Sequence, residues 1–106
     1  MSQHHFASLL DGHPVLVVAG YDRPLRELFV NVYHGADDGG EETLYSSIHD
    51  PARDWADPWT VLARLAELHI AVPATLLPAL VEDQREEAGN KLAFHYFERP
   101  PEVASV

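Results

Sequence analysis

VLVVAGYDRPLRELFVNVY, residues 15–33, is the stretch around which the fold is organised. It begins with an apolar run that suits a strand buried on both faces, and it ends with a run whose apolar residues alternate, as in a half-buried strand. The residues between the two runs favour a turn, because glycine tolerates positive φ, aspartate hydrogen-bonds nearby backbone and proline fixes its own φ. We therefore expect a β-hairpin whose structural turn consists of Gly20, Asp22, Arg23 and Pro24.

Alternation divides the second strand into two faces. Leu28, Val30 and Val32 are expected to face the core, because side chains two residues apart lie on the same side of a strand. The same rule, applied to further strands expected over residues 43–48 and 91–98, adds aromatic and polar residues to the opposite face. The predicted interaction face consists of Phe29, Asn31, Tyr33, Tyr45, Ser47, His95 and Phe97.

Two helices are expected between the third strand and the last. Asp57-Pro58 is a strong helix start, since aspartate can cap the free amides and proline suits the first helical position. Val72-Pro73 ends this helix and starts a second one. The sequence thus predicts an α+β fold, in which an antiparallel sheet of about four strands, in the order β-β-β-α-α-β, carries a helical hairpin packed on one face.

The whole chain, residues 1–106, is expected to form a single domain, since it is long enough to bury one core. Residues 1–13 mix apolar and polar residues, which suggests an N-terminal arm or a short helix, and His4 and His5 within it are expected to be solvated. Residues 99–106 follow the last strand and are expected to be a flexible tail.

The charge balance disfavours two classes of partner. The formal net charge is -10, from 17 acidic and 7 basic residues, so the chain repels phosphate backbones and anionic lipid surfaces. No apolar run approaches the roughly 18 residues that a membrane span needs. The absence of cysteine excludes thiolate metal sites and suits a reducing compartment. We expect a cytoplasmic protein with neither a nucleic-acid partner nor a membrane partner.

The histidines expected near strand ends are the candidate metal ligands. His34, His49 and His95 could contribute imidazoles, and Asp50 a carboxylate, to a transition metal. Alternation along the expected strands places His34 on the core-facing side and His49 and His95 on the opposite face. A site shared by all three would therefore need a bulge or a bend. The acidic loop 37–42 offers oxygen atoms but lacks the ligand spacing of a calcium-binding loop. We therefore predict no cofactor.

The sequence indicates no catalytic residue. Ser46 and Ser47 do not lie in a nucleophile elbow, and the glycines form neither a phosphate loop nor a dinucleotide fingerprint. Trp55 and Trp59 flank the expected helix start, where they could line a cleft or pack against the core. We expect the protein not to be an enzyme.

Three functional hypotheses follow. A single helical hairpin covers only one face of a sheet, so the aromatic face favours a non-enzymatic interaction protein that forms a homodimer or binds a protein partner. The second hypothesis is a small metal- or ligand-binding protein that uses the strand-end histidines. The third is an acidic inhibitor or immunity-type protein that binds a basic partner.

Overall fold

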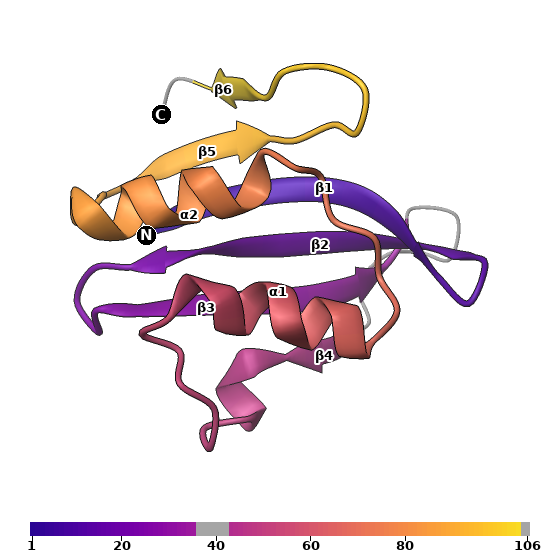
Figure 1. The fold of residues 1–106 in the computed structure, drawn as a ribbon, viewed down its shortest axis with the longest axis horizontal. Coiled ribbons are helices and arrows are strands. Elements are labelled where there is room, and N and C mark those ends of the chain that lie inside the picture. Colours follow the sequence, from indigo (N-terminus) through magenta and orange to yellow (C-terminus); the bar gives the residue numbers. More distant parts are fainter. Residues whose placement is uncertain (36–42, 105–106) are drawn as a thin grey trace.

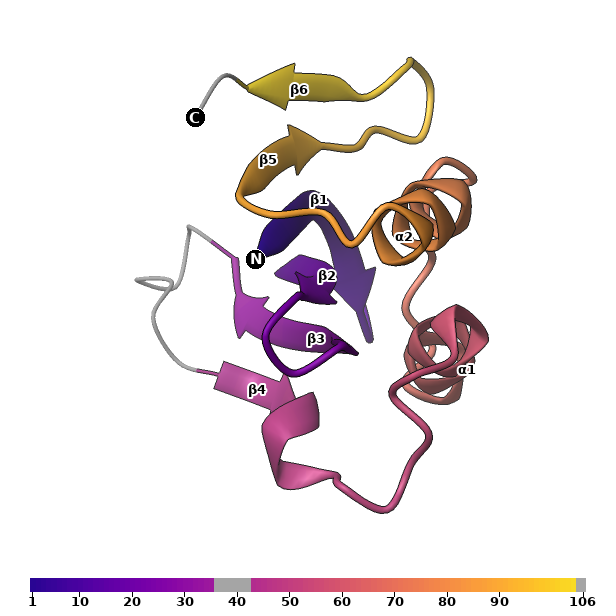
Figure 2. The ribbon, with the colours of Figure 1, turned by 90° about the vertical axis from the view of Figure 1, so that its left-hand side faces the viewer.

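The computed structural model describes residues 1–35 and 43–104, which form one mixed sheet with two α-helices on one of its faces (Figures 1 and 2). In these residues the strand order is β4-β3-β2-β1-β5-β6. The α+β class predicted from the sequence is confirmed. The elements are β1 (Ser2–Leu10), β2 (His13–Asp22), β3 (Glu27–His34), β4 (Thr43–Ser46), the 3-10 helix η2 (Ser47–His49), α1 (Pro58–Glu67), α2 (Leu76–Arg85), β5 (Lys91–Phe94) and β6 (Glu102–Ala104).

The sheet has six strands within the described residues, and it is not purely antiparallel. The segment expected as an N-terminal arm forms β1, which pairs antiparallel with β2 and parallel with β5. Asp11 and Gly12 join β1 to β2 with φ values of 51° and 81°, which suits a two-residue hairpin turn that requires positive φ at both positions. The Asp-Gly pair is the sequence feature that could have predicted this hairpin.

The segment expected as a flexible tail also contains a strand. Residues 102–104 form β6, which pairs antiparallel with β5 at the edge of the sheet. That pairing satisfies backbone groups that β5 would otherwise leave open to solvent. The last two residues of the predicted tail, 105–106, lie outside the described part of the chain.

The predicted central hairpin is confirmed as β2 and β3, which pair antiparallel with Val17 opposite Val32. Its turn lies later in the chain than expected. The Asp22 carboxylate accepts a hydrogen bond from the Leu25 amide, and the Arg26 amide donates to the Arg23 carbonyl over 3.2 Å. The turn therefore occupies residues 23–26, next to the Asp22 side chain.

Gly20 lies inside β2 and not in the turn, so its predicted role is wrong. A Cβ atom at this position would overlap the carbonyl group of Ser2 and would approach the Phe29 ring to 2.9 Å. Glycine is required here because β1 and the aromatic ring of β3 come very close to the backbone of β2.

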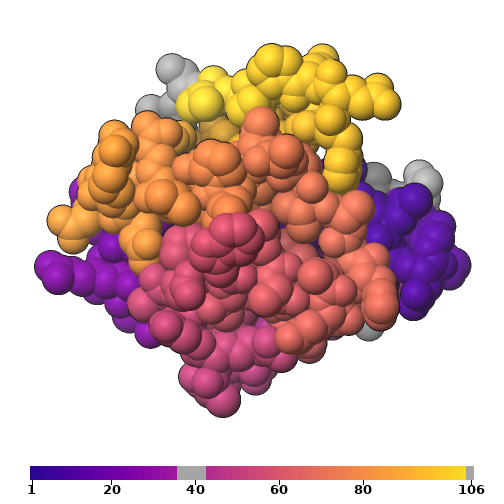
Figure 3. All heavy atoms as spheres, viewed as in Figure 1, coloured from indigo at the N-terminus to yellow at the C-terminus, as the bar shows by residue number. Residues whose placement is uncertain are grey.

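The core lies between the sheet and the two helices. α1 begins after Asp57, whose carboxylate accepts a hydrogen bond from the Trp59 amide over 3.0 Å, as the sequence predicts. Val61 and Leu65 of α1, with Leu76 and Leu80 of α2, are each 0% exposed against the sheet. The space-filling view shows α1 and α2 together covering this side of the strands (Figure 3). In residues 1–35 and 43–104, no helix is both long and apolar enough to cross a membrane.

Candidate functional site

The sheet face opposite the helices is not covered by any element of the described chain (Figure 2). Phe29, Asn31 and Tyr33 alternate along β3 with buried core residues and so lie on this side. Leu16 of β2 and Phe94 of β5 are 36% and 37% exposed. A hollow of about 510 Å³ runs across the strands. We call this surface the open face; it consists of Gln3, His5, Leu16, Val18, Phe29, Asn31, Tyr33 and Phe94.

Tyr45 and Ser47 do not lie on the open face, so this part of the predicted face is wrong. Tyr45 is the partner of the buried Val32 and packs against the core on the helix side. The pairing of β3 with β4 has an irregularity after Val32, which alters the parity of the short strand. Ser47 belongs to η2, where it is buried and accepts a hydrogen bond from the Val30 amide over 3.0 Å.

The predicted positions of His95 and Phe97 on the interaction face are also wrong. β5 ends at Phe94, and within it Ala93 is 1% exposed while Phe94 is 37% exposed, so odd-numbered residues face the helices. His95 follows on the helix side and is 3% exposed. Phe97 meets Phe6 edge-on, with ring centres 6.5 Å apart. Of the seven predicted residues, the structure brings together Phe29, Asn31 and Tyr33 on the open face.

The four candidate metal ligands do not converge. His49 is exposed in η2, beyond the β4 edge of the sheet, whereas His95 follows β5 on the other side of three intervening strands. His34 lies at the end of β3, and Asp50 bonds to Tyr45 and Arg53. Residues 1–35 and 43–104 include no group of three or more side chains suited to holding a metal ion. The acidic loop considered for calcium lies outside the described residues.

A buried chain of hydrogen bonds lies under α2 and was not predicted. His4 Nε2 is 2.5 Å from Asp83 Oδ2, and His4 Nδ1 is 2.8 Å from His95 Nε2. The Thr75 hydroxyl lies 2.7 Å from His95 Nδ1. At the other end Lys91 donates to Asp83 over 3.0 Å. His4 and Asp83 are each 1% exposed. The expectation that His4 is solvated is therefore wrong.

A consistent arrangement of protons exists for this chain of contacts. With both histidines neutral, Thr75 donates to His95, His95 donates from Nε2 to His4, and His4 donates from Nε2 to the Asp83 carboxylate. Every ring nitrogen then has a partner, which a buried polar group requires. The network connects β1, α2, β5 and the segment before α2.

Burial lowers the pKa of His95 to about 4, and the charges of His4 and Lys91 act in the same direction. Burial alone would raise the pKa of Asp83, but hydrogen bonds from His4, Ser2 and Lys91 outweigh it and lower the pKa to about 2. At neutral pH the buried pair is therefore a neutral His95 and an ionised Asp83. No sequence pattern indicated this network, since 79 and 91 residues separate His4 from its two partners.

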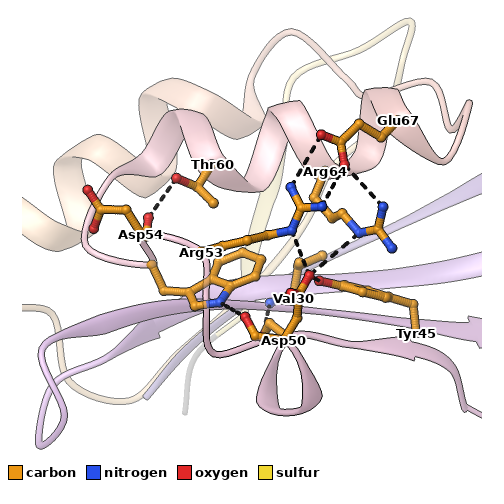
Figure 4. A network of polar contacts seen from close by, with 10 residues as sticks. Val30, Tyr45, Asp50, Arg53, Asp54, Thr60, Arg64 and Glu67 are labelled. Carbon is orange, nitrogen blue, oxygen red and sulfur yellow. Dashed lines mark hydrogen bonds and ion pairs between the residues drawn. The ribbon is translucent and has the colours of Figure 1, made fainter.

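A second polar network ties α1 to the β4 edge of the sheet (Figure 4). The Asp50 carboxylate accepts hydrogen bonds from the Tyr45 hydroxyl over 2.8 Å and from Arg53 over 2.6 Å. Glu67 of α1 pairs with Arg53 and with Arg64, whose guanidinium lies 4.7 Å from the centre of the Tyr45 ring. Two arginines thus face two carboxylates, and the charges balance internally.

Comparison of the chain with models of protein families, with curated proteins and with solved structures gives no match. Function is therefore inferred from the open face, the buried network and the cavities of this structure.

Proposed function

We propose that this protein is a non-enzymatic interaction protein that binds a second copy of itself through the open face. The observation that supports this proposal is the combination of an aromatic surface with a face that no described element covers. Exposed apolar patches of this kind mark interfaces, because removing them from water is favourable.

Charge supports a second copy as the partner. No aspartate, glutamate, lysine or arginine lines the hollow of the open face, although the chain carries a net charge of -10; the Met1 ammonium, which donates to the Asn90 side chain, lies at this hollow. Burial and the charge of His4 lower the pKa of His5, so this imidazole is neutral at neutral pH. Two copies can therefore bring these faces together without juxtaposing charged side chains, and depletion of charged side chains is typical of interface centres.

Geometry also suits face-to-face packing. Phe29 and Tyr33 project from β3, and Leu16 lies opposite Tyr33 on the neighbouring β2. Such rows of side chains from two sheets can interdigitate at a spacing of about 10 Å. The lack of lysine and arginine in the hollow speaks against the stacking of nucleic-acid bases on the same rings.

The test is a concentration series by sedimentation equilibrium with a matched pair of variants. Leu16→Glu places a charge in the open face, and Val81→Glu places the same charge on the exposed side of α2, where Val81 is 44% exposed. We expect a dimer for the wild type and for Val81→Glu. For Leu16→Glu we expect the dissociation constant of the dimer to be at least about tenfold higher. Circular dichroism of each variant verifies that it is folded.

A wild-type monomer at about 100 μM would contradict the proposal, since specific homodimers are tighter than this. Equal dissociation constants for the two folded variants would contradict it as well, because the interface would then lie elsewhere.

A further inference from the structure

A cavity opens where the parallel strands β1 and β5 separate. Their pairing runs from Ser2 with Lys91 to His5 with Phe94, and the hydrogen bond from the His95 amide to the His5 carbonyl follows. Beyond this point the chain departs towards β6. The cavity that remains has a volume of about 820 Å³, within the range of small-molecule sites.

The wall of this cavity is mostly aromatic, and it shares His5, Leu16 and Phe94 with the open face. Phe6 and Phe97 meet at an interplanar angle of 86°, and the rings of His5 and Phe94 lie 5.5 Å apart. Tyr96 completes the set of rings. Aromatic faces carry negative partial charge, so a wall of this kind favours flat rings and cations.

The wall already holds one cation of the chain itself. The Arg99 guanidinium carbon lies 3.8 Å from the centre of the Tyr96 ring, and Glu102 lies 3.7 Å from the same guanidinium. Glu98 also lines the cavity and has no ion pair within the described residues. A carboxylate beside aromatic faces, in a chain of net charge -10, attracts a positively charged guest. We propose that this cavity binds a planar aromatic organic cation.

The buried network fixes the orientation of a side chain in the cavity wall. Both ring nitrogens of His95, which lines the cavity, are engaged by His4 and by Thr75, so this imidazole is held in one orientation. The other imidazole of the wall, His5, bonds to Gln3 through Nε2 over 3.1 Å. Since both imidazoles are neutral at neutral pH, neither repels a cation. A wall whose side chains are already positioned loses little entropy on binding.

The experiment uses the full-length protein and proflavine, a tricyclic aromatic cation, followed by fluorescence anisotropy at pH 7.5. Neutral acridine, with the same three rings, measures the contribution of charge, and anilinonaphthalene sulfonate represents an anion. We expect proflavine to bind about tenfold more tightly than acridine, as a cation on aromatic rings next to a carboxylate should. The anionic dye is expected to bind most weakly.

Four variants locate the site and establish the sign of the charge. Phe97→Ala and Glu98→Gln are expected to weaken proflavine binding, whereas Arg99→Ala is expected to strengthen it by removing the competing cation from Tyr96. Glu86→Gln, on the exposed end of α2, removes the same charge far from the cavity and should leave the affinity unchanged.

Three results would overturn the proposal. Equal binding of acridine and proflavine would show that only apolar contact matters. Tighter binding of anilinonaphthalene sulfonate than of proflavine would assign the site to an anion. An unchanged affinity for Phe97→Ala, in a variant that circular dichroism shows to be folded, would place the dye elsewhere.

Discussion

Acid is expected to destabilise this protein in a pH range set by His95. Its pKa is lowered from 6.5 to about 4, first by burial and then by the charges of His4 and Lys91. At pH values between these two, His95 is protonated in the unfolded chain but not in the folded chain. The contribution of His95 to stability is therefore complete above pH 6.5 and decreases as the pH falls from 6.5 to about 4.

The size of the effect follows from the same two values. A difference between 6.5 and about 4 corresponds to about 3 kcal/mol in the free energy of unfolding. Small domains are stable by about 5–15 kcal/mol, so this loss is a large fraction of the total. Asp83 acts in a lower range, because its contribution is present above pH 3.8 and is lost as the pH falls to about 2.

The assay is urea unfolding at pH 7.5, 5.5 and 4.5, followed by circular dichroism. His95→Gln cannot titrate, so we expect its free energy of unfolding to change between pH 7.5 and 4.5 by about 2–3 kcal/mol less than that of the wild type. His13→Gln removes an exposed imidazole and serves as the control, with an unchanged pH dependence. The reasoning is refuted if His95→Gln loses as much stability between pH 7.5 and 4.5 as the wild type does.

Three further substitutions test the packing. Gly20→Ala should prevent stable folding, since its Cβ would overlap the Ser2 carbonyl, whereas Gly89→Ala should be nearly neutral because only the flexible end of Arg23 is nearby; thermal melts compare the two. Leu65→Ala removes a side chain that is 0% exposed and should cost about 2–5 kcal/mol in urea unfolding, and a cost below 1 would contradict the described core. Ser47→Ala leaves the buried Val30 amide without its acceptor and should cost about 1–3 kcal/mol, with Ser8→Ala as the partly exposed comparison.

Several features of this fold were predictable because they depend on neighbouring residues alone. Alternation along residues 28–33 correctly separated Leu28 and Val30 from Phe29, since side chains in a strand change sides at each residue. Asp57-Pro58 correctly predicted the start of α1, because capping is a contact with the next few amides. The α+β class follows from the same local patterns.

Tertiary structure determined everything that depends on how distant strands are placed beside one another. Alternation shows which residues of a strand share a side, but not which side faces the helices. The register with β3 placed Tyr45 on the helix side, and His95, just after the end of β5, lies there too. The His4–His95 contact joins residues 91 positions apart. It forms only because β1 pairs with β5, a long-range contact that no local pattern encodes. The buried network and the cavity both follow from that pairing.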